Sequence, residues 1–178
     1  MKNIKVNLTE FKSLIKNLIK EEYEKLGFGN FGSAYKKEGK VHKITTDEKE
    51  IAIAKAIEKS DYIPLALPII ENIIEKNNKV VIIKDMYNSF KNLDEDTDIN
   101  KLEKILSNNV VGINKYFFGQ ISRKSIDSKF KDYPKFAEFI HNLKNDYKNI
   151  PLRKGIDFLD IRLDNIGVKN NQYILFDF

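Results

Sequence analysis

Paired runs of β-forming residues, each joined by a tight-turn sequence, limit what the first half of the chain can fold into. One pair of runs stands on either side of Glu38-Gly39, and two longer apolar runs, 69–75 and 79–84, are joined at Asn77-Asn78. Glycine and asparagine tolerate the positive φ angles that two-residue hairpin turns require. Each pair is therefore predicted to form an antiparallel hairpin, so the first half is predicted to be built largely from β-structure.

Two helices are predicted in the same half. The first is an amphipathic packing helix over 7–25, where apolar residues recur at three- and four-residue steps after the capping pair Asn7 and Glu10. The second lies between the two hairpins and follows a capping sequence at 45–48. Its apolar positions are Ile51, Ala54 and Ile57.

The second half of the chain changes character. Residues 92–100 are polar and predict a surface linker, with a short helix behind it at 102–106. A longer helix is predicted to begin at Pro134, because proline is favoured at the first position of a helix. A last hairpin is predicted to turn at 169–171. The expected fold class is α+β, with a β-rich domain over 1–86 and a mostly helical domain over 87–178.

Composition excludes several classes of protein. The chain has 178 residues, 42% of them hydrophobic, which is enough for a real core and argues against general disorder. Its net charge of +5 is mild and spread along the sequence, so we expect no nucleic-acid partner. There is no cysteine and there are two histidines, which exclude disulfides and argue against zinc. No signal peptide or membrane-length apolar run is evident, so we expect a cytoplasmic protein with no membrane partner.

Three glycines and a lysine form a candidate phosphate-binding segment. Gly27, Gly29 and Gly32 lack side chains, so backbone N–H groups there can approach phosphate oxygens. Taken alone, this pattern fits an ordinary glycine-rich turn equally well. It precedes a strand hairpin rather than opening a helix, which argues against a dinucleotide-binding fingerprint. Lys43 lies on the strand that follows, where its ammonium group can reach the α- and β-phosphates if an acidic residue holds it.

A polar cluster near the end of the sequence carries the candidate chemistry. Asp160 is placed to orient an attacking hydroxyl and accept its proton, and Arg162 is placed to steady a transferring phosphoryl group. Asn165 and Asp177 offer the oxygen ligands that Mg²⁺ prefers, and the predicted hairpin between them returns the chain so that both can face one site. The alternative interpretation is an ordinary capped polar turn formed by Asp160, Asp164 and Asn165.

The order of these segments resembles the protein-kinase-like superfamily, including its aminoglycoside- and choline-kinase-type branches, over residues 26–178. The resemblance implies a bilobal protein-kinase-like fold with a β-rich N-lobe and a shortened helical C-lobe. It implies a glycine-rich loop over 26–34, a catalytic loop over 158–165, and ATP and Mg²⁺ as cofactors. By the same resemblance 83–87 is the hinge beside the nucleotide, with Asp85 at its start and Tyr87 at its end.

The resemblance also offers two partners for Lys43. Glu50 heads a run that looks like the pairing helix of kinases, although it follows Lys43 by only seven residues, whereas Glu58 has the longer spacing found in many kinases. We favour Glu50. Two departures from the family pattern are Phe158 and Leu159, which stand where a histidine and an arginine usually brace the catalytic loop.

Three functions follow as expectations. The first is transfer of the γ-phosphate of Mg·ATP to Ser or Thr hydroxyls of a protein. The second is a small-molecule phosphotransferase, and the third is a nucleotide-binding, pseudokinase-like module that engages a partner protein. Because the sequence stops at Phe178, the resemblance leaves no room for an activation segment and its peptide-docking surface. The region 88–131 has no assigned role, and self-association is left open.

Overall fold

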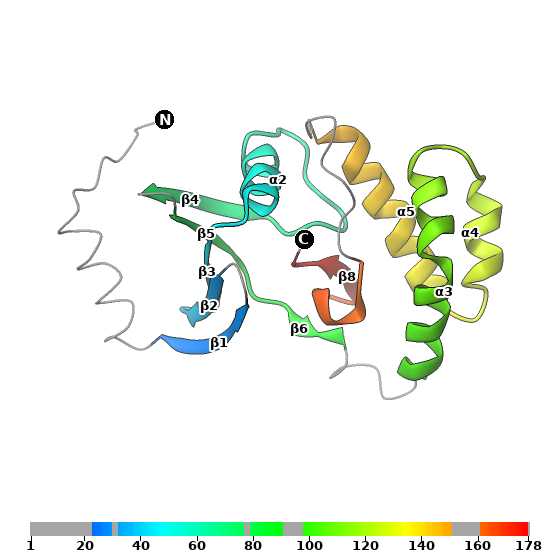
Figure 1. The fold of residues 1–178 in the computed structure, drawn as a ribbon, viewed down its shortest axis with the longest axis horizontal. Coiled ribbons are helices and arrows are strands. Elements are labelled where there is room, and N and C mark those ends of the chain that lie inside the picture. The colour runs from blue at the N-terminus through cyan, green and yellow to red at the C-terminus, as the bar shows by residue number, and fades with distance from the viewer. Residues whose placement is uncertain (1–22, 30–31, 77–78, 91–97, 151–160, 178) are drawn as a thin grey trace. The chain divides into compact units, whose positions relative to one another are not determined.

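The computed structural model describes residues 23–29, 32–76, 79–90, 98–150 and 161–177 (Figure 1). The fold is mixed α+β, with a five-stranded antiparallel sheet followed by helices. The described residues divide into two compact units, one within 1–51 and 70–86, the other within 52–69 and 87–178. The boundary between 86 and 87 is shared with the predicted domains, whereas 52–69 groups with the second unit. The assignment of two functional domains stays a prediction.

The first unit is an antiparallel sheet in the order β1-β2-β3-β5-β4. The predicted turn between β2 and β3 is confirmed, because Glu38 and Gly39 both have positive φ angles, 50° and 75°. The predicted pairing of the two apolar runs is also confirmed, with Ile74 opposite Val81. The strands are β1 (Glu24–Gly29), β2 (Gly32–Lys37), β3 (Lys40–Thr45), β4 (Ile70–Lys76) and β5 (Lys79–Asp85).

Strand β1 corrects the prediction of a helix over 7–25. Most of that range lies outside the described residues, but Glu24 and Lys25 are in a strand, paired with Lys36 and Tyr35 of β2. Pairing along the edge of the sheet satisfies backbone groups that local periodicity had assigned to a helix.

Helix α2 (Glu48–Glu58) begins as its capping sequence predicts. The carboxylate of Asp47 accepts hydrogen bonds from the backbone N–H groups of Lys49 at 2.8 Å and Glu50 at 3.4 Å. The buried face of the helix differs by one position from the predicted one, because Ile51 is only half-buried. Its buried residues are Glu50, Ile53, Ala54 and Ile57.

The second unit combines helices with a small sheet in the order β6-β7-β8. The predicted start of a helix at Pro134 is confirmed, but the short helix predicted at 102–106 belongs to one of 19 residues, which Asp98 caps. The predicted turn near 169–171 is also confirmed, with φ angles of 51° at Asn170 and 64° at Asn171. The elements are β6 (Asn88–Ser89), α3 (Ile99–Phe117), α4 (Arg123–Lys129), α5 (Pro134–Asn149), a 3-10 turn η2 (Leu163–Asn165), β7 (Ile166–Lys169) and β8 (Gln172–Leu175).

Polar side chains on α5 join segments of this unit. His141 lies 2.8 Å from the hydroxyl of Tyr116 on α3 and 2.7 Å from the carboxylate of Asp127 on α4. One turn and a half later, Asp146 is fully buried and accepts hydrogen bonds from the segment 62–67. The core of the unit is therefore tied together by hydrogen bonds as well as by apolar packing. Within the described ranges, none of the helices combines the length and apolar character that a membrane crossing would need.

Candidate active site

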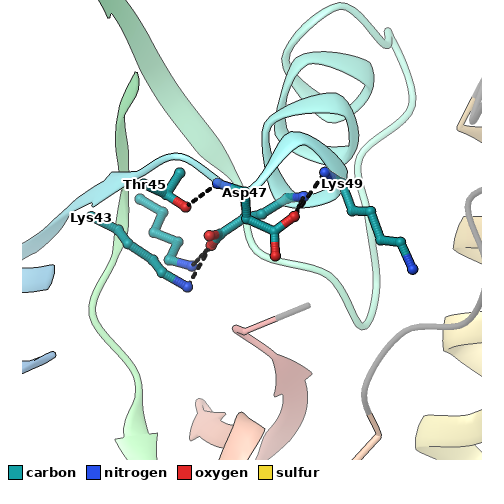
Figure 2. A network of polar contacts seen from close by, with 6 residues as sticks. Lys43, Thr45, Asp47 and Lys49 are labelled. Carbon is teal, nitrogen blue, oxygen red and sulfur yellow. Dashed lines mark hydrogen bonds and ion pairs between the residues drawn. The ribbon is translucent and has the colours of Figure 1, made fainter. Parts of the chain in front are cut away.

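Lys43 and Glu50 form a nearly buried ion pair in the first unit. Lys43 Nζ lies 2.7 Å from Glu50 Oε1, and the two side chains are 18% and 3% exposed. The local sequence explains how the two residues meet. Thr45 Oγ1 accepts a hydrogen bond from the backbone N–H of Asp47, and Asp47 then caps α2, so β3 turns directly into the helix that carries Glu50 (Figure 2). Of the two predicted partners, Glu50 is the one brought to Lys43, whereas Glu58 is exposed at the far end of α2.

Lys84 is a third member of this cluster and was not predicted from the sequence. Its Nζ lies 3.9 Å from the same oxygen of Glu50, and its side chain is only 3% exposed. The cross-strand register places Lys84 opposite Val41 and Ile82 opposite Lys43, so both lysines lie on one face of the sheet. The available signal was period-two alternation along β5, which groups position 84 with the apolar Val80 and Ile82.

The glycines of the candidate phosphate-binding segment have different surroundings. A Cβ at Gly32 would overlap the carbonyl oxygen of Ile44, so close contact between β2 and β3 requires glycine there whether or not a ligand binds. A Cβ at Gly27 would meet no atom within 4 Å. Gly29 pairs with Gly32 across the hairpin, and residues 30–31 between them lie outside the described residues. Of the two glycines whose surroundings are described, Gly27 has open space against it that a ligand could fill and Gly32 does not.

The predicted hinge over 83–87 overlaps the end of β5. Asp85 is the last residue of β5, and its carboxylate pairs with Lys40 Nζ at 2.6 Å. Lys40 also pairs with Glu71, and hydrogen bonds to these two carboxylates, that of Asp85 first, hold the pKa of Lys40 above its usual value. The side chain of Asp85 thus joins β3 to β5. Tyr87 is half-buried, with Lys169 Nζ 5.9 Å from its ring centre.

The two predicted magnesium ligands lie at the two ends of the terminal hairpin in the second unit. Ile166 of β7 pairs with Leu175 of β8, and the backbone N–H of Phe176 donates to the carbonyl oxygen of Asn165 at 2.9 Å. Asp177 is the next residue and is half-buried. The strand pairing thus brings Asn165 close in space to the residue that precedes Asp177, although eleven positions separate them in the sequence.

One amide and one carboxylate suit a magnesium ion that keeps several waters and shares phosphate oxygens with a nucleotide. Asn165 and Asp177 have this chemistry. Across the described ranges there is no group of three or more His, Cys, Asp or Glu side chains that could hold a metal by itself. Arg162 and Asp164 are exposed, and Asp160, the predicted catalytic carboxylate, lies outside the described residues.

The likeness of this chain to known proteins is limited to solved structures and is weak. No known protein family matches the chain, and no curated protein has a similar sequence. Among solved structures, the streptomycin–ATP–APH(2″)-IIa ternary complex is similar over 98% of this chain and 71% of its own, with 13% sequence identity and a TM-score of 0.35. Because this likeness is weak, we base the function on the residues of the chain alone.

Proposed function

We propose that this protein is an ATP-dependent phosphotransferase that moves the γ-phosphate of Mg·ATP to a hydroxyl group, most readily that of Ser or Thr in a protein. The observation that carries the proposal is the ion pair of Lys43 with Glu50, a 2.7 Å contact between side chains that are 18% and 3% exposed. The buried carboxylate of Glu50 holds the ammonium group beside it by opposite charge, although its Oε1 atom makes no hydrogen bond of normal geometry. An ammonium group held on a strand beside a glycine hairpin can bind phosphate oxygens.

In this proposal the residues of the two units have separate tasks. Lys43 binds the α- and β-phosphates, and Gly27 leaves space for them to approach the backbone. Asn165 and Asp177 would hold Mg²⁺, which supplies neutralisation of phosphate charge when bound. Asp160 orients the acceptor hydroxyl and takes its proton, and Arg162 steadies the transferring group.

We also propose that 1–86 and 87–178 are the N-lobe and C-lobe of a protein-kinase-like fold, with the nucleotide base at Asp85 to Tyr87. A purine can pair with backbone N–H and C=O groups where a chain leaves a sheet, and β5 ends at Asp85. The expected partners are a protein that carries the acceptor hydroxyl and Mg·ATP itself.

The test is transfer of label from γ-labelled ATP with Mg²⁺, using the purified protein with and without a cell extract. We expect labelled protein from the wild type and no labelled protein from Asp160→Ala. Asp132→Ala is the matched control, because it removes an exposed carboxylate outside the predicted catalytic loop, and it should transfer label normally.

The acceptor class is read from the same experiment. Label on extract proteins supports a protein kinase, whereas label only on small molecules would move the proposal to a small-molecule phosphotransferase. Binding of ATP without any transfer would favour a nucleotide-binding module that engages a partner. If the wild type neither binds ATP nor transfers label, the proposal is wrong.

A further inference from the structure

Lys84 is a buried lysine that shares its counter-ion with Lys43. The Nζ atoms of the two side chains lie 2.7 Å and 3.9 Å from the same oxygen, Glu50 Oε1. Since this oxygen is common to both contacts, the two ammonium groups are within about 7 Å of each other. Two positively charged ammonium groups therefore lie beside one buried, negatively charged carboxylate.

Burial at this position needs an explanation. Moving an ammonium group out of water is unfavourable unless an opposite charge lies close to it. On the same face of β5, Val80 and Ile82 are 5% and 1% exposed, so an apolar residue would suit position 84. At the start of the same strand Lys79 is exposed, as strand lysines usually are. The carboxylate of Glu50 places a compensating negative charge 3.9 Å from the ammonium group of Lys84.

We propose that Lys84 is a positioning residue. It becomes the ion-pair partner of Glu50 when Lys43 leaves Glu50 to bind a polyphosphate. This inference rests on the proposed function and deepens it. If Lys43 left Glu50 without a second cation nearby, a buried carboxylate would lose its counter-ion. With Lys84 at 3.9 Å, a movement of about 1 Å brings its ammonium group to normal ion-pair distance from Glu50.

Two other charged side chains near this cluster have partners of their own. Lys36 of β2 is opposite Val41, and it forms a 3.1 Å ion pair with Glu24 of the neighbouring strand. Asp47 is used to cap α2. The proposed exchange involves Lys43, Lys84 and Glu50, and its ligand is an extended anion such as the phosphate chain of a nucleotide.

The first measurement is independent of nucleotide. Competitive acetylation followed by mass spectrometry gives the apparent pKa of Lys43 in the folded wild-type protein and in variants. Lys84→Met removes a like charge close to Lys43 and leaves Glu50 to Lys43 alone, so the apparent pKa of Lys43 should rise by about one unit. Lys84→Arg keeps the charge and Lys79→Met changes only an exposed lysine, so both variants should leave the apparent pKa of Lys43 unchanged.

The second measurement uses inorganic tripolyphosphate as the probe, detected as protection of Lys43 from acetylation. The exchange predicts that Lys84→Met weakens tripolyphosphate binding about tenfold, because Lys43 is then held by a carboxylate with no alternative cation. Lys84→Arg should restore binding to within about twofold of the wild type, which a merely space-filling role would not require. The affinities of the wild type, Lys84→Met and Lys84→Arg for Mg·ATP should follow the same order as their affinities for tripolyphosphate.

The outcomes separate this inference from the proposed function. An unchanged pKa of Lys43 in folded Lys84→Met overturns the shared contact, and a raised pKa with undiminished tripolyphosphate binding overturns the exchange. If the pKa rises but no protein binds tripolyphosphate or Mg·ATP, the proposed function and the exchange both fail, while the shared contact stands. Should Lys84→Met not fold, Lys43→Met gives the reciprocal test, because the apparent pKa of Lys84 must then rise.

Discussion

Asp146 shows how much of the second unit depends on one carboxylate. Its oxygens accept hydrogen bonds from the backbone N–H groups of Leu65, Ala66 and Leu67 at 2.7–3.0 Å, and from the Tyr62 hydroxyl at 2.9 Å. Burial raises the pKa of Asp146, and these hydrogen bonds act in the opposite direction. One helical side chain thus fixes the irregular segment that follows α2.

We predict that Asp146→Ala lowers the free energy of unfolding by about 3 kcal/mol, because it leaves buried N–H donors without an acceptor. The free energy of unfolding of Asp146→Asn should lie between those of the wild type and Asp146→Ala, since one amide oxygen remains as an acceptor but an NH₂ group faces the donors. Asp132 is half-exposed and pairs only at the surface with Lys101, so Asp132→Ala should change the value by less than about 0.5 kcal/mol. Urea unfolding of the full chain measures all three, and equal effects of Asp146→Ala and Asp132→Ala would contradict this account.

His42 predicts a pH dependence of stability. Burial, followed by the nearby charge of Lys37, lowers the pKa of His42 below its ordinary value of 6.5. Between that lowered pKa and the ordinary one, the unfolded chain binds a proton that the folded protein does not, so acidification favours unfolding. We expect the free energy of unfolding to fall as pH drops below about 6.5, and to fall less in His42→Gln. Parallel urea titrations at neutral and mildly acidic pH test this, and an identical fall in both proteins would show that His42 is not responsible.

At the scale of elements, the hairpin of β1 and β2 uses glycine for two separate reasons. Gly32 lies against the backbone of Ile44, whereas Gly27 has open space where a side chain would be. The same residue type in one motif therefore serves strand packing at one position and leaves room for a ligand at the other.

Two substitutions separate these roles. Gly32→Ala should destabilise the protein by about 2 kcal/mol, because the added methyl group overlaps a backbone oxygen and forces β2 and β3 apart. Gly27→Ala should leave the free energy of unfolding within about 0.5 kcal/mol of the wild type and weaken Mg·ATP binding. Urea unfolding and nucleotide titration are the paired measurements. Normal ATP affinity in Gly27→Ala would remove this hairpin from the nucleotide site.

At the scale of the whole molecule, a ligand of the folded state must stabilise the entire chain. Mg·ATP at one hundred times its dissociation constant should raise the free energy of unfolding by about 2.7 kcal/mol. We expect Asp177→Ala to lose the part of this gain that needs Mg²⁺, and Lys43→Ala to lose most of it. Asp132→Ala, which changes an exposed carboxylate outside the proposed site, should keep the full gain.

Thermal or urea unfolding with ATP, with and without Mg²⁺, makes this measurement. A gain in Asp177→Ala that still depends on Mg²⁺ would disprove the assignment of Asp177 as a metal ligand. A gain that survives Lys43→Ala would instead remove Lys43 from the phosphate site.

Local interactions decided the features that the sequence alone predicted. The turns at Glu38-Gly39 and Asn170-Asn171 depend on φ angles that few residue types tolerate, and the helix start at Pro134 depends on a fixed φ and a missing N–H group. The cap at Asp47 is equally local, and it sets the short path from Lys43 to Glu50. Such features involve neighbours in the chain and leave a direct mark on composition and spacing.

Tertiary structure alone decided which charged residues are buried and where pairing overrides periodicity. Glu24 lies in a strand because β2 offers it hydrogen-bond partners, and Asp146 is buried because a segment some eighty positions earlier supplies its donors. Lys84 looks like any other lysine in a chain with 31 Lys and Arg residues, and only the register of β3 and β5 turns it toward Glu50. Burial and counter-charge depend on contacts between distant parts of the chain, so the sequence could predict a lysine–glutamate pair here but not the second lysine that shares it.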